Sequence, residues 1–139
     1  MERGYRDLNV YQLAYKLAME IFEISKSFPK EETYSLTDQI RRSSRSVSVN
    51  IGEGYRKRKY PKYFSSKMTD ADGECTETQI WLDFARDCKY IKEEIRNKLF
   101  EEYKEVGRML EAWLIILINF YPGINCQLPL PTAAMIKEI

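Results

Sequence analysis

The 139-residue chain contains no histidine, and this absence excludes several kinds of functional site. Without imidazole there is no histidine general base and no Ser/His/Asp or Cys/His nucleophile system. There is also no histidine ligand for haem or for most zinc and di-iron sites. We therefore expect a protein that is not an enzyme and that uses no cofactor and no metal ion.

Cysteines and long apolar runs are also scarce. Cys75, Cys88 and Cys126 are an odd number without CxxC spacing, and the N-terminus lacks the charged start and apolar run of a signal peptide. The most apolar stretch, residues 112–120, is about half of the roughly 20 residues that span a bilayer. These features predict a cytoplasmic protein without a membrane span.

Four stretches of the chain repeat apolar residues at three- and four-residue steps, which is the pattern of amphipathic helices. They span about residues 8–28, 36–51, 61–88 and 92–120. None of the five prolines interrupts these stretches, and no segment alternates apolar and polar residues as a strand does. The sequence therefore predicts an all-α fold, an antiparallel up-down-up-down four-helix bundle over residues 1–121, followed by a proline-rich tail over residues 122–139.

Local signals mark where the expected helices begin. Asp7 or Asn9 can cap the first helix. Ser35, with Asp38 three residues later, resembles a capping box for the second helix. Pro61 suits the first turn of the third helix.

Four glycines fall inside or near these helices. Gly52 and Gly54 weaken the end of the second helix. Gly73 and Gly107 cost up to about 1 kcal/mol each, so we expect another backbone to pack close to them.

Charge is segregated along the chain although the net charge is only +1. Residues 41–67 contain nine Lys or Arg and one acidic residue, so this segment carries +8 and the other residues together carry −7. A dense cationic surface binds phosphates by releasing counterions. The segment therefore predicts a ridge that binds RNA or DNA, made of Arg41, Arg45, Arg56, Lys57, Arg58, Lys59 and Lys62.

Four members of this ridge, Arg41, Arg45, Arg56 and Lys59, share a solvent-facing stripe if the second helix continues past its glycines. The tyrosines that lie among these basic residues are candidates to stack on unpaired nucleobases: Tyr55, Tyr60 and Tyr63. Two alternatives remain. The basic side chains are simply solvated, or they dock on the acidic third helix of a neighbouring chain.

A row of polar residues lies on the shoulder of the apolar face of the second helix. We expect these residues to hydrogen-bond to one another and to fix the register between helices or subunits without chemistry. The row consists of Gln39, Arg42, Ser46, Asn50 and Glu53.

The third helix carries a carboxylate stripe, Asp70, Glu74 and Glu77, at i, i+4, i+7 spacing. Di-metal bundles combine such carboxylates with histidines, which this chain lacks. We therefore interpret the stripe as a solvated face or as partners for arginines. Metal-dependent hydrolysis of nucleic acid at these residues is the enzymatic alternative.

Near the end of the fourth helix, residues 113–118 are apolar on every side. One core does not cover every side of a helix, so this pattern predicts burial between subunits. The alternative is that the C-terminal tail covers the patch. The interface residues that we expect are Trp113, Ile115, Ile116 and Ile118.

Over about residues 5–118, the sequence resembles the four-helix-bundle family encoded in intervening sequences of bacterial 23S ribosomal RNA genes. The similarity rests on YRDLNVYQLA at the start of the first helix, on Phe28-Pro29, and on QIRRSSRSVSVNIGEG in the second helix. The family usually has alanine at positions 43 and 52, where this chain has serine and glycine. It usually has serine where this chain has Glu74.

The resemblance implies a homopentamer of four-helix subunits with a basic surface and no enzymatic activity. Relatives of the family include accessory proteins of diversity-generating retroelements, which implies binding of RNA or DNA and a reverse transcriptase as a candidate partner. The sequence thus predicts an oligomeric nucleic-acid-binding accessory protein. The alternative is a homo-oligomeric scaffold for protein–protein interaction, without a nucleic-acid function.

Overall fold

The computed structural model describes residues 4–120, apart from the side chains of Ile118 and Phe120. Most of this part consists of four helices: α1 (Asn9–Ser25), α2 (Leu36–Arg56), α3 (Pro61–Asp87) and α4 (Glu93–Phe120). Two short 3-10 helices, η1 (Tyr5–Asp7) and η2 (Lys30–Glu32), precede α1 and α2. Residues 4–120 contain no strand, so the prediction of an all-α fold with four helices is confirmed there. The predicted tail, residues 122–139, lies outside the described residues.

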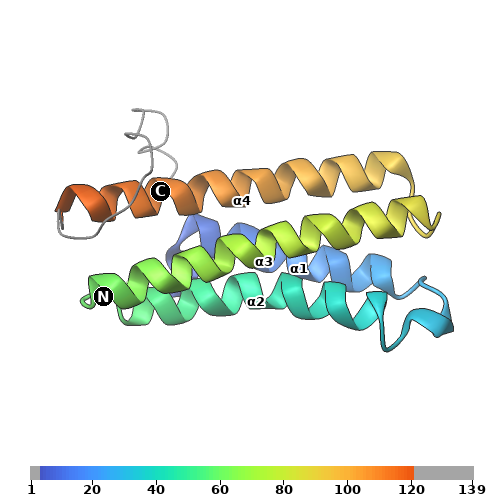
Figure 1. Cartoon of the computed structure of the whole chain (residues 1–139), viewed down its shortest axis with the longest axis horizontal. Helices are drawn as coiled ribbons and strands as arrows, with labels where there is room; N and C mark the ends of the chain where they lie inside the picture. The colour runs from blue at the N-terminus through green and yellow to red at the C-terminus, as the bar shows by residue number, and fades with distance from the viewer. Residues whose placement is uncertain (1–3, 121–139) are drawn as a thin grey trace.

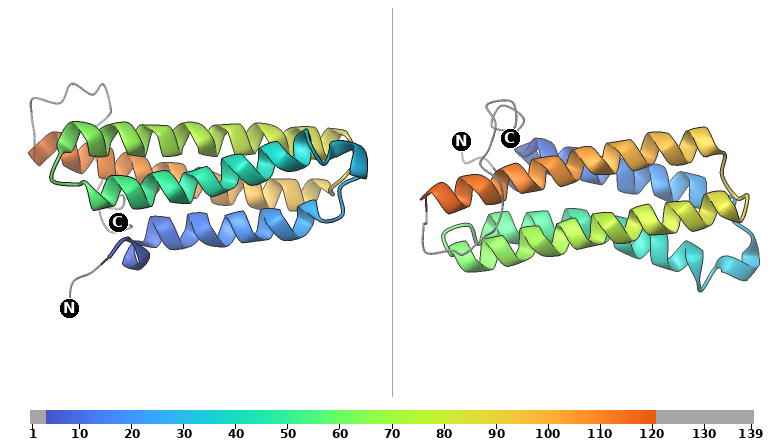
Figure 2. Two further views of the ribbon diagram at one scale, coloured as in Figure 1. Left: turned by 90° about the horizontal axis from the view of Figure 1, so that it is seen from below. Right: turned by 45° about the horizontal axis from the view of Figure 1, so that its top comes forward.

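The four helices lie side by side, and the chain reverses direction at each connection (Figure 1). Each helix packs on its neighbour in the sequence, and α1 also contacts α4, which closes the bundle. The left view of Figure 2 shows α2 between α1 and α3. None of the described helices is long and apolar enough to cross a membrane.

The helix starts agree with the sequence only in part. Pro61 opens α3 as predicted. The capping box predicted at Ser35 is wrong, because the Ser35 hydroxyl donates to Glu32 Oε1 (3.1 Å) and makes no cap hydrogen bond. The N-cap position of α1 is Leu8, so neither Asp7 nor Asn9 caps this helix.

The core runs along the bundle and is made of aliphatic side chains from all four helices. Leu17, Ile40, Leu82 and Leu110 are completely buried. α2 and α3 form the most extensive helix pair, and a buried hydrogen bond from Thr78 Oγ1 to Ser43 Oγ (2.8 Å) links them. The packing of α2 on α3 therefore fixes both ends of the turn that carries the basic residues.

Gly54 marks a close approach of α2 and α3. A Cβ atom at Gly54 would lie 3.0 Å from Lys67 Cβ and 3.1 Å from Met68 Cε. The close backbone packing predicted at Gly73 and Gly107 is wrong. The space around Gly73 is open, and the nearest atom at Gly107 belongs to a side chain, Asp72 Oδ1, at 3.4 Å.

We expect Gly54→Ala to lower the free energy of unfolding by about 1–2 kcal/mol, because the strain of overpacking exceeds the gain in helix propensity. Gly52→Ala is the matched control, since a Cβ there meets only the Tyr5 ring at an ordinary contact distance of 3.6 Å. This variant should gain up to about 1 kcal/mol. Urea unfolding measures both, and an equal gain in both variants would contradict a tight contact at Gly54.

Candidate nucleic-acid interface

Five cationic side chains gather at the connection between α2 and α3. Arg56 ends α2, the next three basic residues lie in the connecting turn, and Lys62 lies in the first helical turn of α3. All five are exposed, and none forms an ion pair with a carboxylate of the described residues. The N-terminus of α3 adds the positive end of a helix dipole at the same place. We call Arg56, Lys57, Arg58, Lys59 and Lys62 the basic turn.

Aromatic rings hold several of these cations in place. The Arg58 guanidinium lies 4.2 Å from the centre of the Tyr55 ring and donates to the Tyr55 carbonyl (3.0 Å). The Lys57 and Lys59 ammonium groups lie 4.9 and 5.3 Å from the centres of the Tyr63 and Tyr60 rings. Such cation–π contacts are worth about 0.5–1 kcal/mol at exposed sites. They orient the charges without neutralising them.

The other two members of the predicted ridge, Arg41 and Arg45, lie away from the basic turn. Arg41 Nε donates to Ser25 Oγ (2.7 Å), and its guanidinium lies 4.9 Å from the centre of the Phe22 ring on α1. The Arg45 guanidinium lies 5.7 Å from the centre of the same ring. The predicted helical stripe is wrong for Lys59, because α2 ends at Arg56 and Lys59 lies in the turn. The ridge therefore consists of two separate groups of cations.

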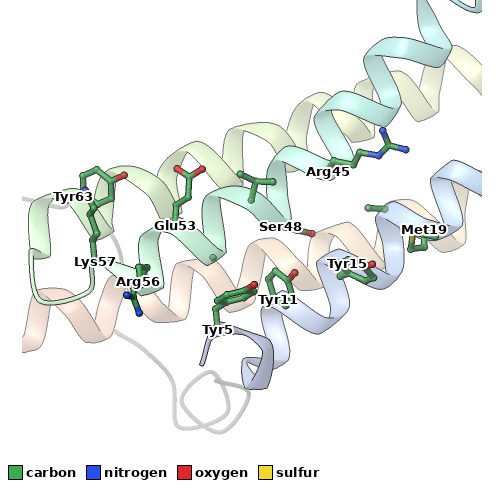
Figure 3. Close-up of a pocket in the computed structure, with 13 residues that line it drawn as sticks. Tyr5, Tyr11, Tyr15, Met19, Arg45, Ser48, Glu53, Arg56, Lys57 and Tyr63 are labelled. Carbon is green, nitrogen blue, oxygen red and sulfur yellow. The ribbon is translucent and has the colours of Figure 1, made fainter. Parts of the chain in front are cut away.

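A groove of about 810 Å³ between α1 and α2 connects these two groups. Arg45 lies toward one end of it, and Arg56 and Lys57 lie toward the other (Figure 3). Its α1 side carries Tyr11 and Tyr15, which the sequence analysis did not assign to a site. The sequence feature that could have pointed to these two tyrosines is their i, i+4 spacing, which places them next to each other beside the apolar face of the first helix.

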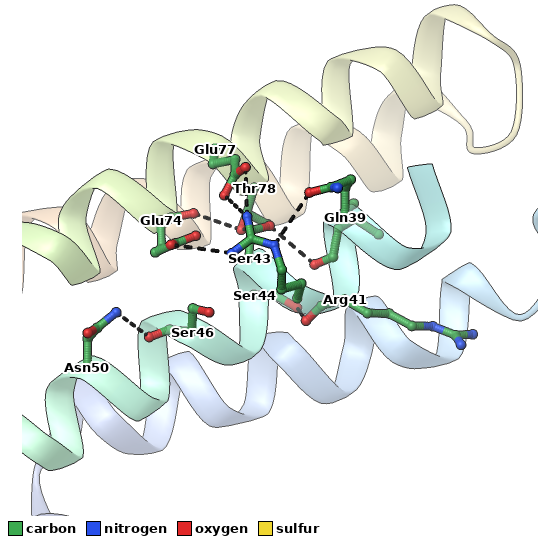
Figure 4. A network of polar contacts seen from close by, with 11 residues as sticks. Gln39, Arg41, Ser43, Ser44, Ser46, Asn50, Glu74, Glu77 and Thr78 are labelled. Carbon is green, nitrogen blue, oxygen red and sulfur yellow. Dashed lines mark hydrogen bonds and ion pairs between the residues drawn. The ribbon is translucent and has the colours of Figure 1, made fainter. Parts of the chain in front are cut away.

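The polar row of α2 bonds mainly across to α3 and less along itself (Figure 4). Arg42 donates to both carboxylate oxygens of Glu77 (2.9 and 2.8 Å), lies 3.7 Å from Glu74, and reaches Gln39 at 3.4 Å. Asn50 donates to the Ser46 carbonyl (2.9 Å).

At the end of the row nearest the basic turn, Lys67 Nζ lies 2.9 Å from Glu53 Oε2. The row therefore ties α2 to α3.

The carboxylate stripe of α3 is largely used by this network. Glu74 and Glu77 are partners of Arg42, whereas Asp70 is exposed and forms no ion pair among the described residues. Within residues 4–120, no three His, Cys, Asp or Glu side chains form a group that could hold a metal ion. Two of the three carboxylates thus serve as partners for an arginine.

Burial raises the pKa of Glu74, and the neighbouring Glu77 raises it further, while Arg42 lowers it. Because this pKa is higher in the folded state, the stability that protonated Glu74 contributes is complete below its ordinary pKa of 4.5 and is lost as the pH rises through the folded value.

We therefore expect Glu74→Gln to be more stable than the wild type at pH 7, with a flatter dependence on pH above 4.5. The midpoint of urea unfolding, measured at several pH values from 4.5 to 7, tests both expectations. Asp70→Asn, at an exposed position inside α3 without an ion-pair partner among the described residues, is the control and should change either quantity little. A less stable Glu74→Gln at pH 7 would show that the contact with Arg42 outweighs burial.

The apolar end of α4 lies partly inside the single chain. Trp113 is half-buried and packs edge-on against Phe64, with ring centres 5.9 Å apart. Ile115 is 2% exposed, which leaves it no surface for a partner chain, contrary to our expectation for this residue. Ile116 is half-buried, and the side chain of Ile118 lies outside the described residues. For Trp113 and Ile116, a subunit interface stays a prediction.

Comparison with known proteins matches the chain to a protein family and to solved structures. The family model described as 23S rRNA-intervening sequence protein matches residues 6–112. A crystal structure of a protein with unknown function from the S23 ribosomal protein family of Bacteroides thetaiotaomicron is 24% identical, with a TM-score of 0.69. The similarity covers 76% of this chain and 97% of that one, and it shows a shared fold. No curated protein matches the chain.

Proposed function

This chain belongs to the 23S rRNA-intervening sequence protein family, and from this premise we propose that it binds RNA or DNA through the basic turn without catalysing a reaction. The observation that carries this proposal is the gathering of five exposed cations that form no ion pair with the described carboxylates. Phosphates are the natural counterions for such a cluster. Binding is independent of sequence, because the turn offers charge and no set of base-reading side chains.

The protein acts as a cytoplasmic homo-oligomer, and the family resemblance favours a pentamer. A ring of five subunits would present five basic turns to one nucleic acid, so modest affinity at each turn would add up to tight binding. A reverse transcriptase is the protein partner that the similarity to retroelement accessory proteins favours.

The competing role, a scaffold in which the basic ridge of one chain docks on the acidic α3 of another, has less support. Glu74 and Glu77 are already bound to Arg42 of the same chain. Of the stripe, Asp70 remains as a carboxylate without an ion-pair partner among the described residues. A scaffold of this kind would dissociate in salt.

The absence of catalysis is tested with labelled RNA and DNA incubated with the protein and Mg²⁺. We expect both nucleic acids to be bound and to stay intact. Cleavage that disappears in Glu74→Ala would instead assign a metal-dependent nuclease to the carboxylate stripe.

A further inference from the structure

The groove between α1 and α2 exposes more apolar surface than a solvated helix pair requires. Tyr15 is 54% exposed, Met19 46% and Val49 54%, and all three line the groove. The rings of Tyr5, Tyr11 and Tyr15 form a row, with centres 4.9 and 6.0 Å apart. The groove therefore offers aromatic and aliphatic surface to a ligand.

A buried polar atom lies in the same groove. Ser48 is only 7% exposed, and its hydroxyl has no hydrogen-bond partner among the described residues. Figure 3 shows this oxygen directed from α2 toward the tyrosines of α1. Buried hydroxyls in native proteins are nearly always bonded, so an unpaired one at the wall of a groove indicates that a ligand supplies the missing partner.

The charge at the rim selects the kind of ligand. Arg45 lies toward one end of the groove, Arg56 and Lys57 lie toward the other, and Glu53 is the one acidic residue among those that line it. Arg45 and Arg56 are eleven residues apart on one helix, a rise of about 16 Å, several times the ~3.4 Å per nucleotide of a stacked strand. A ligand with flat apolar parts and spaced negative charges fits this arrangement.

We infer that the groove between α1 and α2 binds the unpaired bases of a single-stranded nucleic acid, whose phosphates lie along Arg45, Arg56 and Lys57. This inference rests on the proposed function and specifies its substrate class. Bases of a duplex are stacked inside the helix and do not present their faces to the tyrosines. Single strands do, and base stacking on aromatic side chains tolerates any sequence.

The experiment uses the full-length protein and three fluorescently labelled probes of equal length: a mixed-sequence single strand, its duplex, and the same strand with abasic sites in its centre. The abasic strand has the same phosphates and lacks the bases that stack. We expect the intact single strand to bind at least about fivefold more tightly than either of the other two probes.

Tyr15→Ala tests the aromatic row, since this side chain is more than half exposed and its loss leaves the core intact. Affinity for the intact single strand should fall at least about fivefold, toward that of the abasic strand, while duplex affinity stays constant. Tyr34→Ala is the matched control, because Tyr34 is 93% exposed and lies in the connection before α2, away from the groove. It should bind all three probes as the wild type does.

Ser48→Ala separates binding from folding. It should weaken single-strand binding while thermal stability stays level or rises, because an unpartnered buried hydroxyl is removed.

Equal affinity for the intact and the abasic strands would overturn the groove as a base-binding site and leave the basic turn in place. A change of subunit number in Tyr15→Ala, seen by light scattering, would overturn it too, by showing that a second copy of the chain occupies the groove. No binding of any probe would overturn the proposed function itself.

Discussion

Replacing Arg56, Arg58 and Lys59 together by alanine is expected to lower the affinity for RNA and DNA on the order of 100-fold at about 0.15 M salt. None of the three side chains is neutralised by a described carboxylate, so each can contact a phosphate. Each contact contributes about 0.7–0.9 to the slope of log affinity against log salt concentration, and the slope should therefore fall by about 2–3. Fluorescence anisotropy titrations at several salt concentrations measure both quantities.

A second triple variant, Lys30→Ala with Lys92→Ala and Lys98→Ala, removes the same charge from η2 and around the start of α4. These two segments lie at the opposite end of the bundle from the connection between α2 and α3 (Figure 1). These three lysines are exposed and also lack ion-pair partners within residues 4–120. We expect this control to lose less than about tenfold in affinity. Equal losses in the two triple variants would mean that binding follows net charge and that the basic turn has no special role.

The largest expected effect on stability concerns Tyr103, the largest fully buried side chain of the described chain, which is 1% exposed. Tyr103→Ala should lower the free energy of unfolding by about 3–5 kcal/mol, because the lost ring leaves a cavity in the core. Urea unfolding followed by circular dichroism measures the loss.

Tyr103→Phe isolates the contribution of the hydroxyl. This group is buried without a partner among the described residues, and burial raises the pKa of Tyr103 well above its ordinary value. Removing it should leave stability level or raise it, since a buried group without a hydrogen bond costs about 1–3 kcal/mol. A loss of more than about 1 kcal/mol in this variant would show that the hydroxyl has a partner.

Much of the fold follows from local sequence patterns. The apolar repeat and Pro61 placed α3, and the repeat placed α4, within about one residue of their observed ends. The caps did not follow, because a Ser-x-x-Asp pattern specifies residue types and not the backbone angles at Ser35. The crowding at Gly54 and the open space at Gly73 did not follow either, because they depend on what packs beside each glycine in the folded chain.

The candidate site, like the fold, could be predicted from the sequence only in part. The basic turn was visible in the sequence, because four of its five residues are consecutive, the fifth follows three residues later, and their charges need no tertiary partner. Pairing of the carboxylate stripe with arginines was one of the two interpretations that the sequence favoured. Which arginine pairs with it was not visible, since a helical wheel gives a direction while Glu77 lies 35 residues away from Arg42 in the sequence. The groove needs Tyr15 of α1 and Ser48 of α2 to meet, and only packing of the two helices brings them together.

Nucleic-acid binding is tested most directly by titrating labelled RNA and DNA with the wild-type protein at several salt concentrations, with light scattering on the same samples. We predict tight binding at low salt that weakens steeply as salt rises, while the number of subunits stays constant. Absence of binding at low salt would contradict the proposed function. An oligomer that instead dissociates as salt rises would identify a scaffold whose charged faces serve its own assembly.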